Sequence, residues 1–104
     1  MKQRDELAIL FVDDESDILH SLNRFLRREE YRKFFVDNAV EALELLAKTP
    51  VDLVVSDLRM PGMNGLDLIK EVKRLYPGTL RMIVSGSQDI EQIIESVNKG
   101  EIFR

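Results

Sequence analysis

Four short apolar runs divide the chain. They are "LAILFV" at residues 7–12, "VDLVVS" at residues 51–56, "LRMIV" at residues 80–84 and a weaker run, "RKFFVD", at residues 32–37. Continuous β-branched runs of this kind, without strict apolar–polar alternation, are typical of strands that are covered on both faces. The pattern therefore predicts the strands of a parallel sheet.

Helical periods lie between and after these runs. Apolar residues recur at intervals of three and four within residues 15–30, 38–48, 65–76 and 89–100, which predicts four helices. Asn38 with Glu41 resembles a capping pair, "PG" at residues 77–78 ends the third helix, and Gly100 suits a C-cap of the fourth. The expected buried stripes are Ile18, Leu22, Phe25 and Leu26; Ala39, Ala42, Leu43 and Leu46; Leu66, Ile69, Val72 and Tyr76; and Ile90, Ile93, Ile94 and Val97.

The alternation of strands and helices predicts an α/β fold, with a parallel sheet that has helices on both faces. Sheets of this kind bind ligands outside the carboxyl ends of their strands. Asp13 and Asp14 follow the first predicted strand, Asp57 follows the third, and Ser85 follows the fourth. We therefore expect three carboxylates and a hydroxyl to converge at one edge of the sheet.

Convergent carboxylates point to a particular chemistry. Like charges a few ångströms apart raise one another's pKa unless a cation relieves them. Mg²⁺ prefers oxygen ligands and leaves coordination positions to water and phosphoryl oxygens, and an Asp can act as a covalent nucleophile that forms an aspartyl-phosphate. The pattern indicates Mg²⁺-dependent phosphorylation of one Asp. The competing interpretation is that Asp14, Ser16 and Asn38 are helix N-caps.

Composition narrows the function classes. The chain has 104 residues, enough for one domain, and its net charge of -4 argues against a general nucleic-acid or anionic-membrane binder. It has no cysteine, which excludes disulfides and thiolate metal sites, and its apolar runs are too short to span a bilayer. The first 15 residues lack the features of a secretory signal. We expect a cytoplasmic protein without direct nucleic-acid or membrane contacts.

Three segments carry a family resemblance. "ILFVDDES", "VVSDLRMPGMNGLDLI" and "RMIVSGSQD" closely resemble the receiver domain of two-component response regulators, a flavodoxin-like (βα)5 module with a doubly wound parallel sheet. The resemblance implies that residues 1–104 form a single receiver domain and that Asp57 takes a phosphoryl group from a histidine kinase or histidine phosphotransfer protein. A change of surface conformation would then control an output domain or partner. The domain would be no enzyme beyond self-phosphorylation and slow self-dephosphorylation.

The resemblance also implies roles for the residues around the acceptor. Asp14 corresponds to the direct ligand of Mg²⁺ (or Mn²⁺), Asp13 to the acid that holds the metal mainly through water, and Arg59 to the residue whose main-chain carbonyl is a ligand. Ser85 corresponds to the hydroxyl that bonds a phosphoryl oxygen, and Gly86 to the small residue beside it.

Three residues of the loop after the acceptor predict a preorganised turn. Pro61 fixes one φ angle, whereas Gly62 and Gly65 permit either a positive φ or a close approach of main chains. A loop of this kind presents Asp57 and a nearby carbonyl with little reorganisation.

The chain's ending departs from the family pattern. Family members carry a Lys at the end of a fifth strand and then a fifth helix, but this sequence stops at "KGEIFR", and Lys99 lies too early to be that residue. We expect a receiver that is truncated before the end of its fifth strand and lacks its fifth helix. Such a chain would be marginally stable alone, or would dimerise or exchange an element.

Three alternatives stay open. A phosphorylation-impaired interaction module fits the absence of the family Lys. An aspartyl-phosphate phosphatase generally has a second Asp two residues after its nucleophile, a position that Arg59 occupies here. A flavin or nucleotide binder needs main-chain N–H groups around a phosphate after the first strand, where this chain has "DDES". His20, the only histidine, is expected to be an ordinary helix residue.

Overall fold

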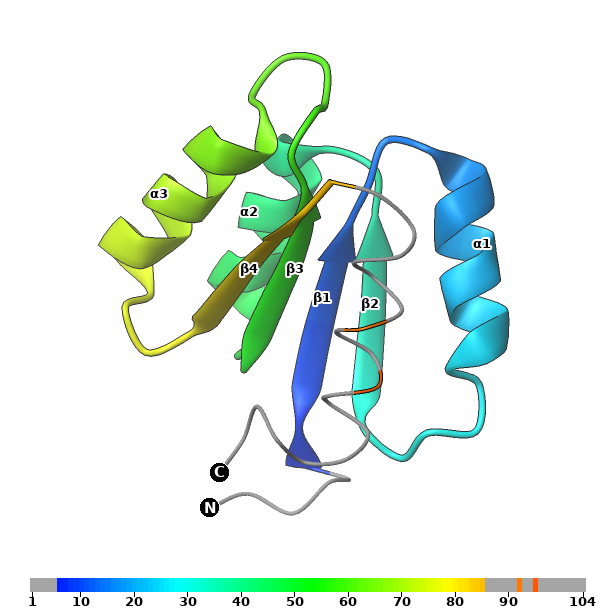
Figure 1. Ribbon diagram of the computed structural model, residues 1–104. Coiled ribbons are helices and arrows are strands. Elements are labelled where there is room, and N and C mark those ends of the chain that lie inside the picture. The colour runs from blue at the N-terminus through cyan, green and yellow to red at the C-terminus, as the bar shows by residue number, and fades with distance from the viewer. Residues whose placement is uncertain (1–5, 86–91, 93–94, 96–104) are drawn as a thin grey trace.

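The computed structural model describes residues 6–85, 92 and 95, and Figure 1 shows how their elements are arranged. Strands and helices alternate as the sequence predicts. The predicted fourth helix, apart from residues 92 and 95, and the start of a fifth strand lie outside the described residues. The elements are β1 (Ala8–Val12), α1 (Ser16–Phe25), β2 (Arg32–Val36), α2 (Ala39–Lys48), β3 (Leu53–Asp57), α3 (Gly65–Leu75) and β4 (Leu80–Val84).

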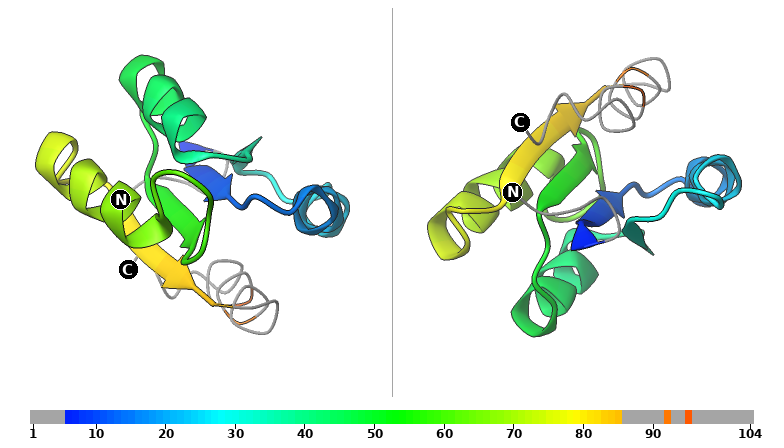
Figure 2. Two further views of the ribbon diagram at one scale, coloured as in Figure 1. Left: turned by 90° about the horizontal axis from the view of Figure 1, so that it is seen from above. Right: turned by 90° about the horizontal axis from the view of Figure 1, so that it is seen from below.

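The four strands form one parallel sheet in the order β2-β1-β3-β4. Figure 2 shows α1 on one face of this sheet and α2 and α3 on the other. The strand order reverses between β1 and β3, because the chain leaves β1 toward β2 and later returns to β1's other side. The carboxyl ends of β1 and β3 therefore lie next to each other, at the point where such sheets bind ligands.

The core has two parts, one on each face of the sheet. Alternate residues of β1 divide between them: Ile9 and Phe11 pack with the buried residues of α1, whereas Leu10 and Val12 pack with those of α2 and α3. All five residues of β1 are buried. This two-sided burial explains why the first apolar run shows no alternation with polar residues.

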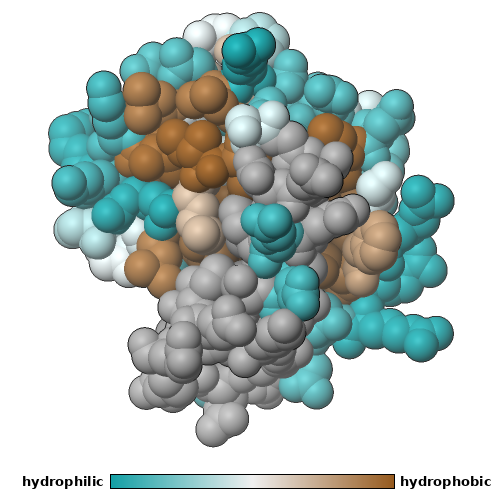
Figure 3. All heavy atoms as spheres, viewed as in Figure 1, coloured by the Kyte–Doolittle hydropathy of each residue, from teal (hydrophilic) through white to brown (hydrophobic). Residues whose placement is uncertain are grey.

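The prediction that two helical residues are buried is wrong. Phe25 is 77% exposed and Leu66 is 44% exposed, whereas Leu19 and Leu68 are buried in their place. Each helical residue turns the side chain by about 100°, so one-residue neighbours of a buried position point elsewhere. Apolar side chains also reach the surface around α3 and β4 (Figure 3), as is usual for folded proteins.

Two helices begin at an asparagine cap. The side-chain oxygen of Asn38 accepts a hydrogen bond from the Glu41 N–H at 2.8 Å, which confirms the predicted cap of α2. Asn64 bonds the Asp67 N–H of α3 at 2.9 Å in the same way. In the described part of the chain, no helix is long and apolar enough to cross a membrane.

Replacing the cap of α2 should destabilise the fold. Asn38→Ala removes one satisfied N–H at the helix start, at a cost of about 1 kcal/mol, which lowers Tm by roughly 4–8 °C in a domain of this size. The matched control is Asn23→Ala, an exposed position inside α1, where alanine favours the helix. Thermal unfolding followed by circular dichroism compares the two, and an equal Tm for both variants would contradict the capping role.

Candidate functional site

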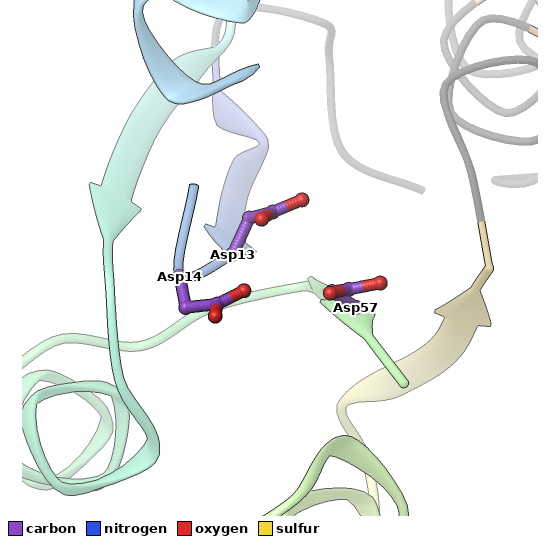
Figure 4. A group of neighbouring side chains, drawn as sticks. All are labelled: Asp13, Asp14 and Asp57. Atoms are coloured by element: carbon purple, nitrogen blue, oxygen red, sulfur yellow. The ribbon is translucent and has the colours of Figure 1, made fainter. Parts of the chain in front are cut away.

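Three carboxylates meet at the carboxyl ends of β1 and β3. Asp13 and Asp14 follow β1, and Asp57 is the last residue of β3 (Figure 4). One carboxylate oxygen from each lies within 4.8 Å of the other two. Asp13 is buried, Asp14 is exposed, and Asp57 lies between these extremes. The prediction that the three acids lie close together at one edge of the sheet is therefore confirmed.

The turn into α1 explains why Asp13 points inward. Its carboxylate oxygen Oδ1 accepts a hydrogen bond from the Glu15 N–H at 2.9 Å, and its own N–H donates to the Val36 carbonyl at 3.2 Å. The N-cap of α1 is Glu15, whose side chain makes no capping bond. The alternative that Asp14 or Ser16 caps this helix is therefore wrong, and the Asp14 carboxylate stays at the mouth of the acid cluster.

Burial and mutual repulsion disfavour the charged form of two of these acids. Burial raises the pKa of Asp13 to about 6; the Glu15 N–H opposes this, and the charges of Asp57 and Asp14 add to it. Burial also raises the pKa of Asp57. The main-chain N–H of Leu58 lowers this pKa, and the charge of Asp14 raises it further. A bound cation would relieve both effects, and carboxylate oxygens are the ligands that Mg²⁺ takes. The donor set thus fits a hard divalent cation.

The loop after Asp57, residues 58–64, brings no further acid to the site. Arg59 is exposed, and its charge lowers the pKa of Asp57. An open pocket beside Asp14 is lined mainly by this loop, with Arg59, Met60 and Pro61 among its residues. No second Asp stands at the position of Arg59, so the loop offers no carboxylate for the acid–base step of a phosphatase.

Ser85 lies at the neighbouring strand end. In the β3–β4 ladder Asp57 pairs with Val84, and the Leu58 N–H donates to the Val84 carbonyl at 3.0 Å. Ser85 follows directly and is exposed, so the sheet brings it to the same edge as the acids. Gly86, the last of the predicted site residues, lies outside the described residues.

The two glycines of the loop serve different needs. Gly62 has a φ of +76°, a left-handed conformation that other residues rarely adopt. Gly65 instead lies against the main chain of Asp57. The sequence left both explanations open for both residues, and it drew no attention to Ser56 or Asn64. An Asn three residues before an acid at a helix start is a signal that points to the Asn64 cap.

Comparisons with known proteins identify the family of this α/β domain. The family model described as "Response regulator receiver domain" matches residues 9–102, so the chain belongs to the receiver-domain family. Its flavodoxin-like architecture and its place among the response regulators of two-component systems follow from that membership.

Individual relatives extend the comparison. The hydrogenase transcriptional regulatory protein HoxA of Cupriavidus necator is 39% identical over 99 residues, which cover 95% of this chain and 20% of HoxA. The sporulation initiation phosphotransferase F of Bacillus subtilis is 32% identical over 90% of this chain and 76% of its own length. The solved receiver domain of an HD domain-containing protein from Pseudomonas fluorescens Pf-5 is 37% identical, with a TM-score of 0.75 over 95% of this chain and 79% of that one.

The raised pKa of Asp13 makes stability depend on pH. A carboxyl whose pKa rises from 3.8 to about 6 on folding contributes stability that is present below pH 3.8 and is lost as the pH rises through 6. At pH 7 and without metal, the charged form of Asp13 therefore lowers the free energy of unfolding. Asp13→Asn keeps the Oδ1 acceptor, so it should raise the free energy of unfolding at pH 7, with a gain that disappears toward pH 4. Urea unfolding in a chelator, measured from pH 4 to 7, tests this.

The control for this experiment is Asp67→Asn, an exposed carboxylate on α3. It removes one charge from the first turn of α3 and should change the free energy of unfolding by no more than about 1 kcal/mol. A gain for Asp13→Asn that is the same at pH 4 and pH 7 would contradict the explanation by burial and repulsion.

Proposed function

We propose that this chain is a phosphoacceptor switch of a two-component system. Asp57 takes a phosphoryl group from a histidine kinase or a histidine phosphotransfer protein, and the change of surface conformation controls an output domain or a partner. The observation that carries the proposal is the meeting of three carboxylates within 4.8 Å at the reversal point of the strand order. Membership of the receiver family supports it.

The acceptor step needs an ionised Asp57. One of its carboxylate oxygens attacks the phosphorus of a phosphohistidine, so that an O–P bond forms as the P–N bond breaks. The electron pair of that bond stays on the imidazole, which takes up a proton. The main-chain N–H of Leu58 and the Arg59 guanidinium both lower the pKa of Asp57, against the effect of burial, and so favour the ionised nucleophile.

The carboxylates of Asp13, Asp14 and Asp57, with the main-chain carbonyl of Arg59, would hold Mg²⁺ or Mn²⁺, which when bound would neutralise the acids and withdraw charge from phosphoryl oxygens. In the same proposal the Ser85 hydroxyl bonds a phosphoryl oxygen of phosphorylated Asp57, and Gly86 leaves room beside it. Pulling Ser85 toward the acceptor would couple phosphorylation to the surface near β4.

We further propose that residues 1–104 act as one receiver domain inside the cell's cytoplasm, together with an output domain. Two comparisons support a role in a larger protein. The chain spans about a fifth of HoxA, whose name describes a transcriptional regulatory protein. It spans about the same share of the DNA-binding transcriptional regulator NtrC of Escherichia coli, to which it is 35% identical.

Asp57 should be the labelled residue. We expect acetyl phosphate to label the protein in the presence of Mg²⁺ and not in excess EDTA, because the crowded carboxylates otherwise repel the donor. Asp57→Asn should abolish the label, read by intact-protein mass spectrometry. The control Asp67→Asn should be labelled at the parent rate, and undiminished labelling of Asp57→Asn would refute the assignment.

Binding of Mg²⁺ should stabilise the fold. At a Mg²⁺ concentration 100 times its Kd, binding to the folded state alone adds about 2.7 kcal/mol to the free energy of unfolding. The rise in Tm should largely disappear in Asp14→Asn, which keeps the fold because Asp14 is exposed, and should persist in Asp67→Asn. Differential scanning calorimetry with and without Mg²⁺ measures it; an equal rise in Asp14→Asn would contradict a site at these acids.

A further inference from the structure

The main-chain carbonyl of Asp57 is held between two residues that the proposed chemistry does not use. On one side, the Ser56 hydroxyl donates a hydrogen bond to it at 3.0 Å, from a side chain that is fully buried. On the other side lies Gly65, so close that a β-carbon there would stand 1.9 Å from the carbonyl oxygen and 2.9 Å from its carbon. We call these two interactions, of Ser56 and of Gly65, the Asp57 carbonyl contact.

The main chain around this carbonyl is held from two more directions, one on the same peptide and one on the next. The N–H of Leu58 donates to the Val84 carbonyl of β4 at 3.0 Å, and the Leu58 carbonyl accepts from the Gly65 N–H at 3.0 Å. The peptide that joins Asp57 to Leu58 is therefore fixed by β3 itself, by β4 and by the first residue of α3. A change in any of these contacts would turn the main chain that carries the acceptor.

Comparison of three glycines shows that Gly65 is required for space and not for conformation. Gly62 alone among the described glycines has a positive φ, and a β-carbon there would meet nothing within 4 Å. A β-carbon on Gly78 would also meet nothing within 4 Å. At Gly65 the added atom would collide with main chain, which cannot swing aside as a flexible side chain does.

We propose that Ser56 and Gly65 are positioning residues for the acceptor. By holding the peptide after Asp57, they direct the Asp57 carboxylate toward the acid cluster and set the course of the main chain into Arg59. This inference rests on the proposed function of Asp57. Neither residue touches the reacting atoms; both act through the main chain.

A collision at 1.9 Å must displace the carbonyl by about 1 Å or more to restore an ordinary contact, and a misplacement of that size can cost about 100-fold in rate. Ser56→Ala causes no collision. It only removes one hydrogen bond from the Asp57 carbonyl. We therefore expect the maximal rate of labelling to fall about 100-fold in Gly65→Ala and about tenfold in Ser56→Ala. The acetyl phosphate concentration for half-maximal rate should stay within about twofold, because the contact positions the acceptor and does not bind the donor.

Each variant has a matched control. Gly78→Ala makes the same substitution where space is free and should label at the parent rate. Ser56→Thr keeps the hydroxyl and should recover most of the rate that Ser56→Ala loses. All proteins are compared at a temperature at which circular dichroism shows each one fully folded, so that a loss of rate is not a loss of folded protein.

A second readout does not depend on phosphorylation. Mn²⁺ affinity, measured by water-proton relaxation, should weaken about tenfold in Gly65→Ala, because Asp57 and Arg59 flank the displaced peptide, and should be unchanged in Gly78→Ala. If the parent binds Mn²⁺ but is not labelled, the proposed function is wrong. The inference about Ser56 and Gly65 is then tested by the Mn²⁺ affinity of Gly65→Ala alone. The inference would be overturned if Gly65→Ala were labelled and bound Mn²⁺ like the parent. Equal labelling rates for Ser56→Ala and Ser56→Thr would also overturn it. So would a parent protein that neither binds Mn²⁺ nor is labelled.

Discussion

Repulsion among three carboxylates is the constraint on which the site depends. The strand order brings the ends of β1 and β3 together, and with them Asp13, Asp14 and Asp57. Two of these acids have pKa values above their ordinary range, because burial and neighbouring charge disfavour ionisation. The cluster therefore opposes folding in the absence of a cation. A cation bound among the three carboxylates would relieve that cost.

The surrounding main chain limits how far the acids can move apart. Asp13 is tied to the start of α1 by the Glu15 N–H, and Asp57 lies on a strand whose next peptide is bonded to Val84. Outward rotation of the Asp13 side chain would break the first bond, and a shift of the Asp57 main chain away from the cluster would strain the second. The fold thus holds like charges close together, and the two core layers of the sheet provide the stability that offsets their repulsion.

The connection between Asp57 and α3 is conformationally restricted at two of its glycines. Gly62 has a positive φ, which residues with a side chain rarely adopt, and Gly65 brings the first turn of α3 against the main chain of Asp57. The position of α3 and the orientation of Asp57 are therefore linked through one peptide. A rigid link of this kind would carry a displacement of the Asp57 main chain to the whole of α3.

The sequence alone determined the order of the described elements and the three acids of the site. Continuous apolar runs, helical periods and acids at strand ends are local patterns, and each follows from a requirement of burial or charge. It could not decide whether Phe25 and Leu66 are buried, because an apolar residue next to a stripe fits the period nearly as well as its neighbour.

Only the tertiary structure decided the rest. It showed that neither Asp14 nor Ser16 is the cap of α1, because the N-cap is Glu15 and the preceding Asp13 N–H is bonded to the Val36 carbonyl of β2. It also separated the two roles of glycine in the connection from β3 to α3. The sequence cannot distinguish the positive φ of Gly62 from the close contact of Gly65 with Asp57. That contact depends on the position of α3 relative to β3, which is a feature of the tertiary structure.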